Sequence, residues 1–435
     1  MAATQHISLC FHFEARVSSN GHGVVLPVGH CHLRGNRLTA GVDGMGRSKK
    51  WTAVGAARSA REARIETAAF LTNAPIARTW FAGRMMQVHD LVVAQTRGDE
   101  DRAKILFLGG LGLAPPYSSD WNEVADMVID GEAELLAKAQ LYVLSPAMCD
   151  VVLAASEALT TEDLALISED DLPSPAGVVV LPHPVLVRSI DGYLRDDRAY
   201  TWSTPARVVR ETTDGSLEEL SAVQISNYDS ARGPLQPASI IRIAAEAAAQ
   251  GTPLPPWTLD GIRSEPFRYV LTAAERQVAD DHNKQMRQYA ANARAGQAKG
   301  GVDERGVIGE YAPGQQVADH DGRFAQRFLY AFWRLCEQRI AEVEPADVTH
   351  SAATRARTAG VSADVRVVSL RSAASVGGRA AAGRDWQHRW VVRMHEVRQW
   401  YPTQERHRVL YRGPYVKGPA DKPILGGEVV RAVVR

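Results

Sequence analysis

Cysteine is scarce in this chain. The 435 residues include four cysteines, Cys10, Cys31, Cys149 and Cys336, and no two of them form a Cys-x-x-Cys pair. This spacing favours neither a disulfide framework nor a zinc ribbon, and it fits a reducing compartment. We therefore expect a cytoplasmic protein.

Long apolar runs are also lacking. The longest, such as residues 105–114 and 176–181, end at proline or charge well short of the roughly 20 residues that cross a bilayer. Residues 1–15 show no basic stretch followed by an apolar one, so we expect neither a signal peptide nor a membrane partner. No Walker loop, G-x-S-x-G elbow, His-Glu-x-x-His motif or kinase signature occurs, which leaves open whether the protein is an enzyme.

Lysine is rare, with 8 residues against 42 arginines, and the formal net charge is zero. This zero hides an asymmetry, because residues 351–435 carry 16 basic against 6 acidic residues, a net charge of +10. Abundant arginine and alanine are typical of a GC-rich genome, so arginine in place of lysine is no evidence of function. The small number of carboxylates in the tail is not explained in this way, so the net charge of the tail remains informative. A basic segment attached to an acidic body is typical of a module that binds a polyanion.

Hydrophobic periodicity predicts a chain with both helices and strands. We expect helices at 56–71, 76–95, 237–250, 266–294 and 323–343, helical pieces within 120–159, and strands at 172–188, 199–210 and 220–227. Ser145-Pro146 is a predicted helix start, and the four prolines at 172–188 should either confine this strand to a sheet edge or lie at its ends. The run 104–113 closes on glycines followed by prolines, which predicts a buried turn rather than a nucleotide-binding loop.

The expected fold class is α+β: a helix-rich N-terminal part with a central β segment, and a small antiparallel C-terminal sheet. A chain of this length exceeds the size at which single cores stop growing, so we expect at least two domains. We divide it into an irregular leader with His and Cys at 1–50 and a mixed α/β body at 51–294. A glycine-rich linker or mobile loop follows at 295–322, and a helix plus a basic antiparallel β module at 323–435.

The tail contains the strongest candidate site. A strand period of two places one set of side chains on an apolar face, namely Trp386, Trp390, Val392, Met394 and Trp400. The opposite face takes Arg389, Arg393 and His395, and after a turn at 401–405 the next strand supplies Arg406, Arg408 and Arg412. Such a hairpin would grip phosphates with its arginines and stack bases on Trp400 or Tyr401, so DNA or RNA is the expected partner.

Two other functions fit the same segment. His395 or His407 would act as general acid or base in RNA cleavage, with a neighbouring arginine stabilising the phosphate in the transition state. Alternatively, the basic sheet docks on the acidic body of a second copy and forms a homo-oligomer without catalysis.

A second group of candidate residues is N-terminal, namely Cys10, His12, His30, Cys31 and His32. Imidazole and thiolate are zinc ligands, but the spacing matches no standard finger. We predict no cofactor, with a structural zinc ion as the alternative. Paired carboxylates at Glu162-Asp163 and Glu169–Asp171 would suit Mg²⁺, yet they precede a proline and predict a solvated link.

The tail also resembles a known group of proteins. The segments Trp386-Gln-His-Arg-Trp-Val-Val-Arg, Gln399-Trp-Tyr-Pro, Pro414-Tyr-Val-Lys-Gly-Pro and Pro423-Ile-Leu-Gly-Gly are similar to the ending of uncharacterised proteins from actinobacteria and their phages or integrative elements. Leu172-Pro-Ser-Pro and the strand after it are similar to the middle of that group, and the likeness covers about a third of the chain. The group has no assigned activity, so the resemblance implies a mobile-element setting and no catalytic residue.

Overall fold

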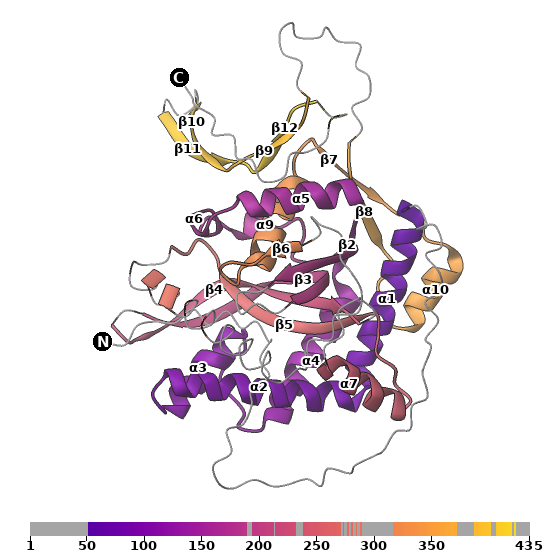
Figure 1. Ribbon diagram of the computed structural model, residues 1–435, viewed down its shortest axis with the longest axis vertical. Coiled ribbons are helices and arrows are strands. Elements are labelled where there is room, and N and C mark those ends of the chain that lie inside the picture. The colour runs from indigo at the N-terminus through magenta and orange to yellow at the C-terminus, as the bar shows by residue number, and fades with distance from the viewer. Residues whose placement is uncertain are drawn as a thin grey trace, which may run out of the picture.

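The computed structural model describes residues 51–188, 194–212, 214–231, 238–270, 316–371, 387–401 and 406–419, together with Lys422 and a few single residues between 273 and 288. A mixed eight-stranded sheet lies at the centre, with helices on both faces and two short antiparallel ribbons above it (Figure 1). The predicted α+β class, including the small antiparallel C-terminal sheet, is confirmed.

The helices and strands have the following bounds. The helices are α1 (Ala53–Asn73), α2 (Pro75–Gln95), α3 (Glu100–Gly110), α4 (Trp121–Lys138), α5 (Pro146–Ala158), α6 (Thr161–Leu164), the 3-10 turn η1 (Glu169–Asp171), α7 (Ala238–Ala249), α9 (Phe324–Cys336) and α10 (His350–Thr358). The strands are β1 (Gln140–Leu144), β2 (Ala176–Arg188), β3 (Leu194–Glu211), β4 (Leu217–Ser230), β5 (Trp257–Pro266), β6 (Gln316–Ala318), β7 (Ala341–Pro345), β8 (Val365–Leu370), β9 (Trp390–Val392), β10 (His395–Tyr401), β11 (Arg406–Arg412) and β12 (Tyr415–Lys417).

The strand order in the central sheet is β5-β4-β3-β2-β1-β8-β7, and β6 pairs with the end of β2. Strand β1 runs parallel to both of its neighbours, β2 and β8. From β2 outward to β5 the strands are antiparallel, and so are β7 and β8. The segment after the predicted linker therefore contributes β7 and β8 to the same sheet as the segment before it, and β6 comes from within the predicted linker itself.

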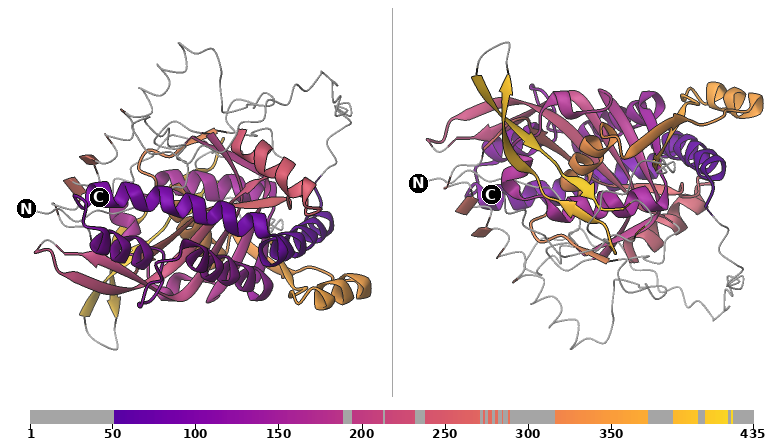
Figure 2. Two further views of the ribbon diagram at one scale, coloured as in Figure 1. Left: turned by 90° about the horizontal axis from the view of Figure 1, so that it is seen from below. Right: turned by 90° about the horizontal axis from the view of Figure 1, so that it is seen from above.

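Two helical layers cover the sheet, α1 to α4 and α7 below it and α5, α6 and α9 above it (Figures 1 and 2). Successive residues of β2 enter different cores, since Val178 and Val180 pack with the lower layer, and Val179 and Leu181 with the upper one. An unbroken apolar run is typical of a strand that is buried on both faces.

The prediction that β2 lies at a sheet edge or has prolines only at its ends is wrong, because β2 pairs with β1 on one side and β3 on the other, and only Pro173 and Pro175 precede it. The register between β2 and β3 shifts between Val180 and Val185, and Pro182 and Pro184 lie inside this irregularity. Proline has no backbone N–H, so an interruption of the ladder is where a central strand tolerates it.

The helix prediction for 120–159 is wrong at β1, because a five-residue apolar run does not distinguish a buried strand from a piece of helix. The predicted helix start at Ser145-Pro146 is confirmed, since Ser145 Oγ accepts a hydrogen bond of 3.2 Å from the Met148 N–H. The predicted helices at 56–71, 76–95 and 237–250 and the strands at 199–210 and 220–227 are confirmed as α1, α2, α7, β3 and β4.

The apolar run at 104–113 is mostly helical. It forms the C-terminal part of α3, and only its last three residues form a turn, of which Leu111 is buried and Gly112 and Leu113 are half-buried. Gly112 there has a φ of +83°, and a Cβ at this position would lie 2.8 Å from Ser264 Oγ. A left-handed backbone conformation and close packing therefore both favour glycine at 112.

Helix α9 was predicted to extend over 323–343, but it ends at Cys336 and residues 341–345 form β7. Ten consecutive residues, from Phe324 to Trp333, are buried, because the sheet lies below the helix and other elements cover its remaining sides. Its aromatic side chains share one core with β1 to β4. The elements on both sides of the predicted linker at 295–322 therefore share one sheet and one core. The helix expected at 266–294 begins within β5 and otherwise falls largely outside the described residues.

Gly177 in β2 provides a stability test, because a Cβ there would lie 2.0 Å from Trp202 Cζ2. Trp202 is fully buried, stacks on Tyr142 and donates from Nε1 to the Ser174 carbonyl at 2.9 Å, so its ring has no room to move. We predict that Gly177→Ala lowers the free energy of unfolding by about 3 kcal/mol, measured by urea denaturation.

The matched control is Gly131→Ala in α4, where the position is exposed and no atom lies within 4 Å of the added Cβ. Alanine favours the helix over glycine, so this variant should be about 1 kcal/mol more stable than the parent. Equal stability of the two variants would contradict the packing assigned to Trp202.

Candidate functional site

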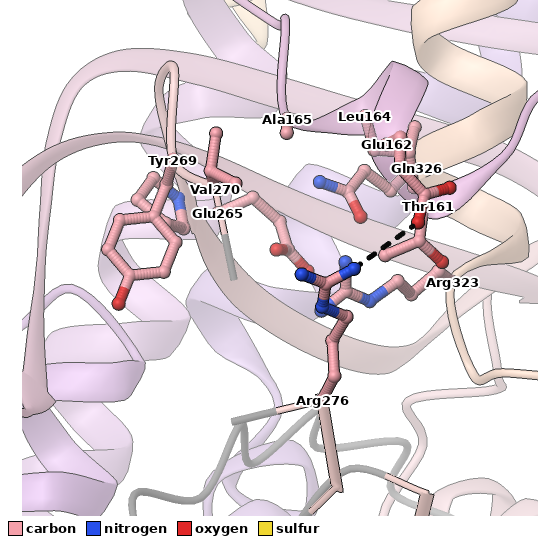
Figure 3. A pocket seen from close by; sticks show the side chains of 11 residues that line it. Thr161, Glu162, Leu164, Ala165, Glu265, Tyr269, Val270, Arg276, Arg323 and Gln326 are labelled. Carbon is pink, nitrogen blue, oxygen red and sulfur yellow. Dashed lines mark ion pairs between the residues drawn. The ribbon is translucent and has the colours of Figure 1, made fainter. Parts of the chain in front are cut away.

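A polar hollow opens beside the N-terminal end of α9 (Figure 3). Its walls come from α6, from the end of β5 and the turn after it, from the first turn of α9, and from Arg276. Its volume is about 430 Å³, including the part open to solvent. The side chains of Glu265, Arg323 and Gln326 reach this hollow from β5 and α9, which are far apart in the sequence.

Ion pairs and hydrogen bonds fix the start of α9. Asp319 Oδ1 accepts from the Phe324 N–H at 3.1 Å, and Asp321 Oδ1 accepts from the Arg323 N–H at 3.1 Å. Arg327 bridges both carboxylates, and this guanidinium holds the pKa of Asp321 below its usual range despite burial. Carboxylates at a helix N-terminus are favoured by the helix dipole, so these contacts set the direction in which α9 begins.

The outer wall of the hollow carries one ion pair and one aromatic ring. Arg276 Nη1 lies 3.9 Å from Glu162 Oε1, and both side chains are more than half exposed, so the pair contributes little to stability. Tyr269 stands on the other side, with the Arg210 guanidinium 3.9 Å from its ring centre. The Arg210 contact holds the Tyr269 ring by a cation–π interaction.

A cluster of four aspartates lies at one end of the sheet, and we call it the aspartate cluster: Asp196, Asp197, Asp229 and Asp260. Asp197 on β3 pairs directly with Asp229 on β4, and Asp260 follows on β5. Arg195 Nε contacts Asp197 at 2.7 Å, and Tyr200 donates its hydroxyl to the same carboxylate. Asn227 donates to Asp260 Oδ2 at 2.9 Å.

Asp229 has the least support in the aspartate cluster. Its Oδ1 atom is buried and accepts no hydrogen bond. Burial first, and then the nearby carboxylates of Asp260, Asp197 and Asp196, raise the pKa of Asp229 well above its usual value. The structure therefore favours a protonated Asp229 over an ionised one.

The described residues contain no group of three or more His, Cys, Asp or Glu side chains arranged to hold a metal ion. This holds for the aspartate cluster as for the rest of that part of the chain. The metal candidates Cys10, His12, His30, Cys31 and His32 all lie outside the described residues.

The structure places the predicted nucleic-acid-binding residues in the C-terminal ribbons. Strands β10 and β11 form the antiparallel hairpin, with Tyr401 opposite Arg406, Gln399 opposite Arg408, Trp400 opposite His407, and His395 opposite Arg412. Arg393 and Arg412 have exposed side chains. Arg389 is half-buried, and its Nε donates to the Lys422 carbonyl at 2.7 Å. This hydrogen bond attaches the residue before β9 to the chain after β12.

The two histidines proposed for catalysis lie in this hairpin. The His395 ring is exposed, with Nδ1 3.1 Å from the Arg393 carbonyl oxygen and its centre 6.0 Å from the Tyr415 ring. For His407 the structure gives the backbone pairing with Trp400. No carboxylate among the described residues contacts the His395 ring.

The acidic link predicted at 162–171 is only partly solvated. Asp171 is 7% exposed and accepts from Arg334 Nη1 at 2.7 Å, which attaches the link to α9. Sequence analysis also missed Glu265, Arg323 and Gln326, because no two of them form a motif. The one feature of the sequence that could have indicated this site is Gln326, a polar residue within the apolar stripe of α9.

Asp229 yields a prediction about pH. Its raised pKa means that the folded state holds this proton more tightly than the unfolded state, so stability is lost as pH rises above the ordinary aspartate pKa. An asparagine is neutral and would donate to the neighbouring carboxylates. We predict that Asp229→Asn is about 1–3 kcal/mol more stable than the parent at pH 8, with the gain shrinking toward pH 4 in thermal melts.

Asp214 provides a control of opposite sign. Hydrogen bonds from Thr212 and Ser216 lower its pKa to about 2. Asp214→Asn should therefore melt below the parent at neutral pH, with the difference lost as pH falls toward 2. A lower melting temperature of Asp229→Asn at pH 8 would show that the Asp229 carboxylate is ionised and stabilising.

Comparison with known proteins identifies no relative. No family model matches the chain, and neither a curated protein nor a solved structure matches it significantly. The resemblance of the tail to actinobacterial and phage proteins therefore stays a prediction. Among the described residues, no helix is both long enough and apolar enough to cross a membrane.

Proposed function

We propose that this chain is a cytoplasmic nucleic-acid-associated protein of a phage or mobile element, and that it binds DNA or RNA through its C-terminal ribbons. Residues 387–422 carry eight arginines and lysines against three aspartates and glutamates. Phosphate contacts of arginine and lysine supply most of the affinity of such binding and little of its sequence preference.

The observation that carries this proposal is the state of Arg393 and Lys417. Both side chains are exposed, and neither has a hydrogen bond or ion pair among the described residues. A basic sheet that neutralised the acidic body of the same chain would pair these groups with carboxylates. Their charges are thus available to a polyanion from outside.

The attachment of the ribbons to the body supports the same proposal. Trp390, Val391 and Val392 are buried, and Val391 belongs to the core that α5 and α9 share with the sheet. Gln338 Nε2 donates to the Pro414 carbonyl at 2.8 Å, which attaches β12 to the end of α9. A surface held on a rigid body loses little conformational entropy when it binds a ligand.

The geometry of His395 supports RNA cleavage as a second candidate. Its Nδ1 atom lies against a backbone carbonyl, which orients the ring, and the chain register places it opposite Arg412. An oriented imidazole beside a guanidinium is the minimum for acid–base catalysis on a phosphodiester. His395→Ala would abolish cleavage of a labelled RNA if this histidine acts.

The double variant Arg393→Gln/Lys417→Gln tests the binding proposal. We predict that it binds fluorescent 20-nucleotide DNA and RNA about tenfold more weakly than the parent at 100 mM salt, because two phosphate contacts are lost. The slope of log affinity against log salt should fall by about 1.4 for single strands and about 1.8 for a duplex, measured by fluorescence anisotropy from 50 to 300 mM salt.

The matched control is Arg207→Gln/Lys138→Gln, which removes the same charge from body positions that are 73% and 74% exposed. It should retain the affinity and most of the slope of the parent. Equal binding by both double variants, or no binding by the parent at 50 mM salt, would overturn the proposal. A complex of two copies that separates at high salt without binding nucleic acid would support self-association instead.

A further inference from the structure

The hollow beside α9 contains three polar groups that lack partners. Gln326 is 3% exposed, and its Oε1 atom is buried without a hydrogen bond. The Glu265 carboxylate is on a residue that is 7% exposed, and it forms no hydrogen bond or ion pair with the described residues. The Arg323 guanidinium forms none either. A buried polar atom without a partner costs free energy, and Gln326 Oε1 is such an atom. The buried Glu265 and the half-buried Arg323 line the same hollow, so the three side chains together indicate a site for a ligand.

The three side chains would bind different chemical groups of a ligand. Arg323 offers only donors in a planar fork, which fits a carboxylate. The Glu265 carboxylate and Gln326 Oε1 are acceptors, and together they fit an ammonium group. Figure 3 shows these side chains converging on the same hollow. A ligand that satisfies all three carries one positive and one negative charge.

The rest of the lining limits the ligand further. Arg276 is already paired with Glu162, whereas Arg323 forms no ion pair with the described residues, although its charge acts on Asp321 at longer range. A ligand with several negative charges, such as a nucleotide, would meet the repulsion of Glu265. Leu164, Ala165 and Val270 add an apolar wall.

We infer that this hollow binds a free α-amino acid with an apolar side chain. The carboxylate of the amino acid lies on Arg323, its ammonium group lies between Glu265 and Gln326 Oε1, and its side chain contacts the Leu164 wall. This ligand is distinct from the nucleic acid proposed for the C-terminal ribbons. Binding at the hollow does not depend on that proposal.

Ligand controls test the charge requirement. Titration calorimetry on the full chain would use L-leucine, L-alanine and L-phenylalanine, together with N-acetyl-L-leucine and L-leucinamide. We expect at least one free amino acid to bind with a Kd below 1 mM. We also expect at least tenfold weaker binding of both blocked leucines, since each lacks one charge. Absence of binding by all three amino acids at 10 mM, or equal binding of the blocked forms, would overturn the inference.

Variants then locate the site. Gln326→Met removes the unpartnered acceptor at similar volume, so the free protein should melt at the same or a higher temperature while amino-acid affinity falls at least tenfold. Arg323→Met and Glu265→Gln should lower affinity to a similar extent. Arg207→Met is the control, because it removes an exposed guanidinium outside the hollow and should bind as the parent does. Parent-like binding by both Gln326→Met and Arg323→Met would show that the amino acid binds elsewhere.

Discussion

A chain of buried ion pairs decides where α9 lies on the sheet. Arg195 on β3 contacts Asp197 at 2.7 Å and approaches Asp319 at 3.9 Å, and Asp319 contacts Arg327 of α9 at 3.3 Å. Buried charges contribute little net stability, but removal of one partner leaves an uncompensated charge that costs about 3–5 kcal/mol. The network therefore tolerates one placement of the helix. That placement forms one wall of the hollow and part of the surface under the C-terminal ribbons.

Local sequence patterns predicted most of the secondary structure correctly. Three and four residue spacing identified α1 and α2, and the apolar stripe identified α9, because a helix that packs on a sheet must repeat its apolar residues in this way. Strand β1 was missed because its five residues are too short for a period to be visible. The central position of β2 was missed because its prolines lie at an irregularity that only the pairing with β3 creates.

The candidate sites were less predictable than the fold. The hairpin of β10 and β11 follows from alternation, since the chain itself brings neighbouring strands together. The aspartate cluster joins residues that are about 30 positions apart along the chain, and their proximity depends on strand order. Glu265 and Gln326 come together only because α9 begins where the Asp319 network places it. No local sequence pattern predicts that residues so far apart along the chain will meet in the folded protein.

The position of β1 has a consequence for how the chain folds. Its two neighbours in the sheet are β2, which follows soon after it, and β8, which begins about 220 residues later. Until β8 has been synthesised, β1 has one side with unpaired backbone groups and an apolar surface. Pairings of such high sequence separation form slowly, because the intervening loop must close first. A nascent or truncated chain that ends before residue 365 thus exposes an edge at the middle of the future sheet, where partly folded copies associate most readily.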